Sequence, residues 1–147
     1  MSRVLMIDPL PPPIVERLRP LFPDGAGFGI VPTYSEEDLA HHAADAEILL
    51  VLHRKVDSHL LSFVPRLRFI QRIGAGYDNL DLGALQAAGV TAAYTPGANA
   101  VAVAEHTILL MLALLKRIAA AESATRQGGW PTMELFQAGL GDLSNAT

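Results

Sequence analysis

The sequence R-I-G-A-G-Y-D-N-L-D, residues 72–81, opens the stretch around which this chain is organised. It is followed by Y-T-P-G-A-N-A-V-A-V-A-E-H, residues 94–106, and by a long apolar segment that ends near Arg117. Glycine accepts a positive φ and lets bare N–H groups approach a ligand, so the G-A-G turn is suited to hold a carboxylate or a phosphate. By itself the turn is weak evidence, because a plain strand-to-helix connection uses the same residues.

A second turn covers residues 94–99. Pro96 and Gly97 interrupt the chain there, and Asn99 is a favourable N-cap for the apolar helix that follows. We expect both turns to follow successive strands and to face one site for an anion.

The rest of the chain alternates short apolar runs with amphipathic segments. The runs read as strands at residues 4–7, 28–31, 48–52, 67–73 and 90–94, separated by helices that start near Pro12, Ser35, Asp57 and Asp81. Parallel strands need right-handed crossovers, so the alternation predicts an α/β fold with helices on both faces of the sheet. The expected arrangement is flavodoxin-like, doubly wound, with strand order 2-1-3-4-5 and a ligand site beyond the carboxyl ends of the strands.

The last expected element is a long C-terminal helix over residues 99–127. Its residues 107–115 are apolar nearly all round, so several sides require burial, but the run is too short for a membrane span. We assign residues 1–127 to one flavodoxin-like domain that includes this helix, and residues 128–147 to a loosely packed tail in which Trp130 anchors the packing.

Composition narrows the function. The chain has 147 residues, of which 50% are hydrophobic and 18% charged, so one folded core is expected. A formal charge of -4 without a Lys/Arg cluster argues against nucleic-acid or anionic-membrane partners. No cysteine is present, which excludes disulfides and thiolate chemistry. The start of the chain lacks the regions of a signal peptide, so a cytoplasmic location is expected.

Four ordered motifs carry a family resemblance: G-A-G-Y-D-N-L-D at 74–81, G-A-N at 97–99, V-A-E-H at 103–106 and G-G-W at 128–130. Together they resemble the substrate-domain half of the D-isomer-specific 2-hydroxyacid dehydrogenases. The resemblance implies reduction of a small 2-oxoacid, or oxidation of a 2-hydroxyacid, by hydride transfer with NAD or NADP. It also implies that the catalytic histidine, its acidic partner and the substrate-gripping arginine belong to the other half of the enzyme, so no residue of this chain inherits a catalytic role.

What carries over is substrate binding. The resemblance implies that the amides of Ala75 and Gly76, in the turn that starts at Gly74, hold the substrate carboxylate, and that the Asn99 side chain donates to a substrate oxygen. For Asn99 a plain helix cap is the alternative. Arg54, after the third strand, could grip a carboxylate bidentately, although a solvated turn explains it equally well.

In the resembled family the chain next enters a nucleotide-binding domain with G-x-G-x-x-G on a helix N-terminus. Here the late pair Gly139 and Gly141 lacks the third glycine. We therefore expect no cofactor-binding residue in this chain, no redox turnover by it alone, and a missing nucleotide-binding domain, through either a natural truncation or an engineered one.

The remaining polar residues have ordinary explanations. His41, His42 and His59 read as surface residues, and no spacing of metal ligands occurs. The pair Glu105–His106 reads as a polar patch, and His53 joins Arg54 at the ligand edge. Asp78 and Asp81 are expected to cap the helix that begins near Asp81.

Two other functions are open. The chain could be a stand-alone flavodoxin-like binding or assembly module that forms a homodimer through helix 99–127, whose apolar surface would otherwise be uncovered. A receiver or flavin-binding domain of the same topology is disfavoured, because no lysine ends the fifth strand and prolines replace a Ser/Thr-rich phosphate loop after the first.

Overall fold

The computed structural model describes residues 3–23 and 25–145 and divides them into two compact units that meet in sequence between Ala98 and Asn99. Each unit is described by itself. The first contains every strand, and the second contains only helical elements.

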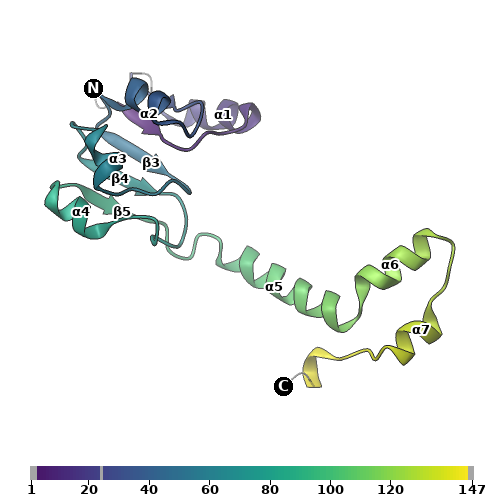
Figure 1. Ribbon diagram of the computed structural model, residues 1–147. Coiled ribbons are helices and arrows are strands. Elements are labelled where there is room, and N and C mark those ends of the chain that lie inside the picture. The colour runs from purple at the N-terminus through teal and green to yellow at the C-terminus, as the bar shows by residue number, and fades with distance from the viewer. Residues whose placement is uncertain (1–2, 24, 146–147) are drawn as a thin grey trace. The chain divides into compact units, whose positions relative to one another are not determined.

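The first unit is built on a five-stranded parallel sheet with the order β2-β1-β3-β4-β5 (Figure 1). The strands are β1 (Val4–Met6), β2 (Gly29–Ile30), β3 (Ile48–Val51), β4 (Phe69–Arg72) and β5 (Thr91–Ala93). Each pair of neighbours is parallel, with Leu49 of β3 opposite Ile70 of β4, for example. The predicted strand order and α/β class are confirmed, and each strand is slightly shorter than its apolar run.

Helices connect the strands at the expected places. They are α1 (Pro12–Leu18) with the 3-10 turn η1 (Arg19–Leu21), α2 (Glu36–Ala43), α3 (Ser58–Ser62) and α4 (Leu82–Ala87). Three begin at side-chain caps, since Ser35, Asp57 and Asp81 accept the amides of Asp38, Leu60 and Ala84. The predicted cap at Asp81 is confirmed, whereas Asp78 lies one turn earlier and does not cap α4.

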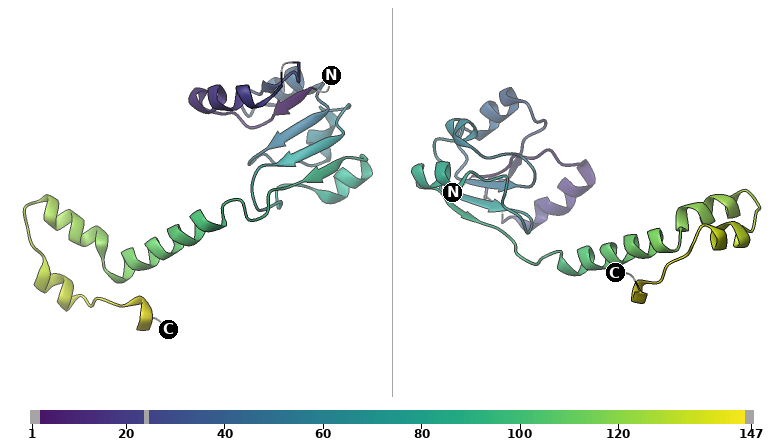
Figure 2. Two further views of the ribbon diagram at one scale, coloured as in Figure 1. Left: turned by 180° about the vertical axis from the view of Figure 1, so that it is seen from behind. Right: turned by 60° about the horizontal axis from the view of Figure 1, so that its bottom comes forward.

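The core lies between one face of the sheet and α2, α3 and α4. Leu49, Val51 and Ile70 point into it from the strands and are fully buried, and Leu39 and Leu60 meet them from the helices. The right-handed crossover to β2 places α1 on the other face, so the sheet lies between α1 and α4 in the right view of Figure 2. On that face Ile48 and Phe69 remain half-buried.

The second unit departs from the prediction of one helix over residues 99–127. The helix α5 (Ala100–Leu115) ends at Lys116, and α6 (Ile118–Arg126) starts anew after Arg117, whose φ of 49° is left-handed. The segment expected to be a loosely packed tail contains α7 (Thr132–Gln137) and the turn η2 (Leu143–Asn145).

The break at Arg117 has a cause within the unit. The carbonyl of Leu115, which in a continuous helix would accept from the next turn, instead accepts from the amide of Gly141 at 3.0 Å. The Arg117 guanidinium donates to the carbonyls of Ala138 and Gly139, and Lys116 pairs with Asp142. Contacts with residues 138–142 therefore outweigh the local helix preference. Trp130, expected to anchor packing, is 84% exposed.

Candidate functional site at the carboxyl edge of the sheet

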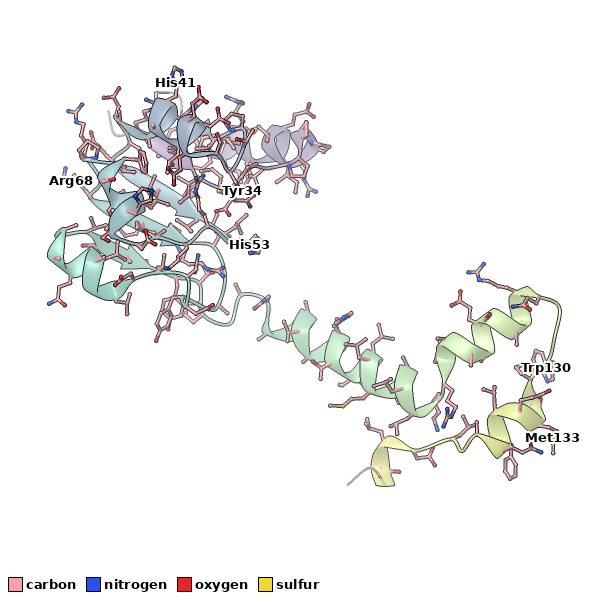
Figure 3. The ribbon with its side chains drawn as sticks, in the orientation of Figure 1. Tyr34, His41, His53, Arg68, Trp130 and Met133 are labelled. Atoms are coloured by element: carbon pink, nitrogen blue, oxygen red, sulfur yellow. The ribbon has the colours of Figure 1, made fainter. Side chains whose placement is uncertain are left out.

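The loops that follow β1, β3, β4 and β5 share one edge of the first unit, because parallel strands all end on the same side. His53 follows β3 at this edge, while Arg68 precedes β4 at the opposite edge (Figure 3). Doubly wound sheets bind ligands outside these carboxyl ends. Nearly all the predicted site residues of the first unit fall there.

The turn after β4 is anchored on both sides of Gly74. Its N–H donates to the Oγ1 of Thr95 at 2.8 Å, and its carbonyl accepts from the amide of Thr95 at 3.1 Å. Gly74 has a φ of 141°, a conformation that side chains rarely allow. The predicted meeting of the turns after the fourth and fifth strands is therefore present between Gly74 and Thr95. Because the Gly74 amide is already bonded, this residue shapes the turn, and the donors of the turn lie beyond it.

Those donors are the amides of Ala75 and Gly76. Both residues are exposed, and in the described part of the chain neither amide donates a hydrogen bond. Two unpaired N–H groups in a fixed glycine turn can hold the two oxygens of a carboxylate. A Cβ placed on Gly76 would lie 2.9 Å from Oδ1 of Asp78, which favours glycine at this position.

Asp8 organises the neighbouring loop after β3. It is 1% exposed, and its carboxylate accepts the amides of Leu52, His53 and Arg54 at 2.6, 2.9 and 2.9 Å. Its Oδ1 also accepts from the hydroxyl of Tyr34 at 3.2 Å. A buried carboxylate is stable only when its lone pairs are satisfied in this way. The result is a rigid loop with an exposed His53 at the ligand edge.

The Arg54 side chain contacts the backbone of the neighbouring loops. Its guanidinium donates to the carbonyl of Ile7 at 3.3 Å and to those of Tyr34 and Ser35 at 3.0 and 3.3 Å. It also lies over the Tyr34 ring, 5.8 Å from the centroid. These contacts give Arg54 a structural task, and its binding of a substrate carboxylate stays a prediction.

The electrostatics of this group follow from its packing. Burial raises the pKa of Tyr34 above its ordinary value, and the nearby charge of Asp8 and the hydrogen bond to it act in the same direction. Arg54 opposes the shift. The shift moves the pKa of Tyr34 further above its ordinary value of 10.0, so at neutral pH the hydroxyl is protonated and donates to Asp8.

Asn99 is the first residue of the second unit, which is described apart from the Gly74 turn. It occupies the N-cap position of α5, as expected, yet its side chain makes no capping hydrogen bond. The Asn99 side chain therefore does not cap α5 by a hydrogen bond, and its predicted contact with a substrate oxygen stays a prediction.

The histidines agree with their ordinary interpretations. His41 and His59 are exposed, and His59 pairs with Glu36 at 2.9 Å. His42 lies 2.7 Å from the Asp38 carbonyl. Among the residues described, no cluster of three or more His, Cys, Asp or Glu side chains could hold a metal ion, and no helix is long and apolar enough to cross a bilayer.

Sequence reasoning missed four residues of this edge: Asp8, Tyr34, Thr95 and Asn79. The last accepts the Arg72 Nε at 3.3 Å and donates to the Arg54 carbonyl at 2.9 Å. An aspartate directly after a buried strand was a usable signal for Asp8. Nothing in the sequence indicated the Tyr34 contact, which joins residues 26 positions apart.

Comparison with known proteins agrees with this geometry. The family model described as D-isomer specific 2-hydroxyacid dehydrogenase, catalytic domain, matches residues 4–140. D-3-phosphoglycerate dehydrogenase of Archaeoglobus fulgidus is 30% identical over 129 residues, which are 87% of this chain and 24% of that protein. Glyoxylate/hydroxypyruvate reductase B of Escherichia coli is 32% identical over 127 residues, 86% of this chain and 39% of that protein.

Solved structures show the same fold. The NADPH-dependent glyoxylate/hydroxypyruvate reductase of Sinorhizobium meliloti in complex with citrate gives a TM-score of 0.70 at 25% identity, covering 100% of this chain and 44% of that one. An NAD-dependent formate dehydrogenase of Staphylococcus aureus, in complex with NAD, gives 0.73 at 20% identity, with 95% and 46% covered.

The chain thus spans less than half the length of these relatives. Since the family model matches nearly all of it and the sheet order and glycine turn agree, the chain belongs to the D-isomer-specific 2-hydroxyacid dehydrogenases.

Proposed function

We propose that this chain is the substrate-binding half of an NAD(P)-dependent D-2-hydroxyacid dehydrogenase and binds the carboxylate of a small 2-oxoacid. The observation that carries the proposal is the pair of exposed, unbonded amides of Ala75 and Gly76 in a turn fixed by Thr95. Thr95 fixes the turn before any ligand arrives, so little ordering cost falls on binding. Gly74 shapes the turn, and Asn99 and Arg54 remain proposed contributors.

The nicotinamide is proposed to bind outside this chain. The late glycines do not fit a dinucleotide cradle, because the Gly141 amide is bonded to Leu115 and the Gly139 carbonyl accepts from Arg117. A Cβ at Gly141 would lie 2.7 Å from Cδ2 of Leu115, so this glycine serves close packing on α5. Hydride transfer from NAD or NADP then requires a nucleotide-binding domain supplied by further sequence, and the chain alone is proposed to be inactive.

The direct test is glyoxylate binding by the isotope-labelled chain, followed through backbone amide NMR shifts, with acetate as the control that lacks the 2-oxo group. Selective, saturable shifts at Ala75 and Gly76 are expected with glyoxylate. Uniform shifts, or none at these two amides, would overturn the proposal. Oxidation of NADH or NADPH by the chain with glyoxylate is expected to stay at background, and turnover would overturn the half-enzyme interpretation.

A second proposed role is homodimerisation through α5. The apolar side chains Val101, Leu109 and Leu114 are 73%, 58% and 79% exposed. A helix that is apolar nearly all round needs a partner surface. Light scattering over a range of concentrations would test this, with Leu109→Glu on α5 compared with Leu82→Glu on α4, which is also half exposed. We expect wild type and Leu82→Glu to form dimers and Leu109→Glu to be monomeric. A monomeric wild-type chain would contradict the role.

Small 2-oxoacids or 2-hydroxyacids are the proposed ligands, nucleic acids and membranes are not proposed partners, and the cytoplasm is the proposed location. Cell fractionation with an antibody against the chain tests the last point.

A further inference from the structure

Arg72 is the last residue of β4 and lies two residues before Gly74, where the glycine turn starts. Its Nη1 donates to the carbonyl of Ile73. A Cβ placed on Gly74 would lie 1.8 Å from this Nη1, 2.9 Å from Cζ and 3.5 Å from Nη2. The guanidinium therefore fills the space beside Gly74 that a side chain would otherwise occupy, and it does so at the beginning of the predicted anion site.

The guanidinium is held in place from its other side. Its Nε donates to Oδ1 of Asn79 at 3.3 Å, and Asn79 is fixed in turn by donating to the Arg54 carbonyl at 2.9 Å. The amide of Arg54 is bonded to the buried Asp8. The backbone carbonyl of Asn79 also accepts from the Val56 amide at 2.8 Å. A chain of hydrogen bonds thus runs from Asp8 to the glycine turn and fixes the position of Arg72.

The charge of Arg72 is uncompensated in the first unit. Within the described residues it forms no ion pair, whereas Arg3, Lys55 and Arg66 each lie near a carboxylate. Asp78 is an acidic residue of the turn, and its Oδ1 would lie 2.9 Å from a Cβ placed on Gly76. A half-buried cation with only neutral acceptors raises the local potential for an anion more than an exposed, paired one does.

We propose that Arg72 is a substrate-binding residue that supplies the positive charge for the anion held by the amides of Ala75 and Gly76. The inference rests on the proposed function and extends it from two neutral donors to a charged site. The guanidinium lies beside Gly74, the residue before Ala75, so in this proposal one planar carboxylate contacts both the guanidinium and the two amides.

Oxalate, a planar two-carboxylate analogue of a 2-oxoacid, is the probe, titrated into the full chain and read at the amides of Ala75 and Gly76. We expect Arg72→Gln to weaken oxalate about tenfold, the loss typical of one charge-assisted contact. Arg72→Lys, which keeps the charge and loses the bond to Asn79, should stay within about threefold of wild type. Arg68→Gln is the matched control, since it removes the same charge at the opposite edge of the sheet (Figure 3).

The outcomes separate the inference from the proposed function. No oxalate shift in the wild-type chain would overturn both. If Arg72→Gln binds oxalate as tightly as wild type, only the role of Arg72 is overturned. The same holds if Arg72→Lys binds oxalate as weakly as Arg72→Gln, because the side chain would then act only through its bond to Asn79. If Arg72→Gln fails to fold, the wild-type chain still decides, since its oxalate affinity must fall as ionic strength rises.

Discussion

Gly74 is the residue whose conformation the site depends on most. At a φ of 141° only glycine is comfortable, and any Cβ would collide with Arg72. We expect Gly74→Ala to lower the free energy of unfolding by about 1–3 kcal/mol, the usual cost of such backbone strain, and to abolish oxalate binding. Urea unfolding and the oxalate titration measure the two effects.

The matched control is Gly89→Ala. Gly89 also has a positive φ, 67°, but a Cβ there would meet nothing within 4 Å. Its cost should be about 1 kcal/mol, and oxalate binding should be unchanged. Equal behaviour of the two variants would contradict the special role of the turn.

Asp57 sets an acid limit for the first unit. The hydrogen bond from the Leu60 amide lowers the pKa of this carboxyl below 3.8, with Lys55 acting in the same direction. A carboxyl with a lowered folded pKa stabilises the protein above its unfolded pKa, and this stabilisation is lost as the pH falls through the folded pKa.

Wild type should therefore lose unfolding free energy on acidification below about pH 4 more steeply than Asp57→Asn, which caps without titrating. Urea titrations at several pH values measure the difference, with Glu16→Gln on the exposed side of α1 as the control. Identical pH profiles for wild type and Asp57→Asn would contradict the assignment.

At the same scale, local chemistry could be predicted and distant contacts could not. The caps Ser35, Asp57 and Asp81 and the bare amides of Ala75 and Gly76 follow from residue type and a few neighbours. The contacts of Asp8 and Arg54 depend on residues about 20 to 46 positions away, which a pattern along the chain does not encode.

Among the elements, the two helices of the second unit show a tertiary contact overriding a helix preference. Nothing between Leu114 and Ile118 is a helix breaker, so a continuous helix was the reasonable prediction. The break arises because the Gly141 amide bonds the carbonyl of Leu115 at the end of α5, and the Arg117 side chain donates to the carbonyls of Ala138 and Gly139.

Substitution of Arg117 tests this account. Glycine accepts the left-handed conformation that arginine adopts at a cost of about 1 kcal/mol, and both Gly and Ala lose the bonds to Ala138 and Gly139. We therefore expect Arg117→Gly to be more stable than Arg117→Ala by about 1 kcal/mol. Thermal unfolding followed by far-UV circular dichroism measures this.

A continuous helix would reverse that order, because alanine is then preferred to glycine. Arg117→Ala with higher helix content and higher stability than Arg117→Gly would mean that the break is not the favoured state. Gln127→Ala, beyond the end of α6, is the control for a general alanine effect.

For the whole molecule, the sheet order was predictable because five apolar runs alternate with capped helices, and chirality leaves few ways to connect them. The division at Ala98 was not. The sequence suggested one domain through residue 127, since a helix that directly follows the last strand looks like part of the same fold, whereas the contacts group it with residues up to 147.

Every buried hydrophobic side chain of the described residues lies between Val4 and Leu85. We therefore expect a fragment ending at Ala98 to fold with the amide spectrum that the first unit has in the full chain, because its core is complete. A poorly dispersed spectrum of the fragment would contradict this, and the full chain measured under the same conditions is the reference.

The carboxylate of Asp8 has a further consequence, in how fast amide hydrogens exchange with solvent. Leu52, His53 and Arg54 lie outside any strand, yet their N–H groups are bonded to the buried carboxylate of Asp8, two residues after the end of β1. They can exchange only when β1 separates from β3, so they should exchange as slowly as the strand amide of Leu50. Ala75 and Gly76, one loop away, should lose their hydrogens at once. The same edge of the sheet would then carry both the slowly exchanging amides of residues 52–54 and the freely exchanging amides of Ala75 and Gly76.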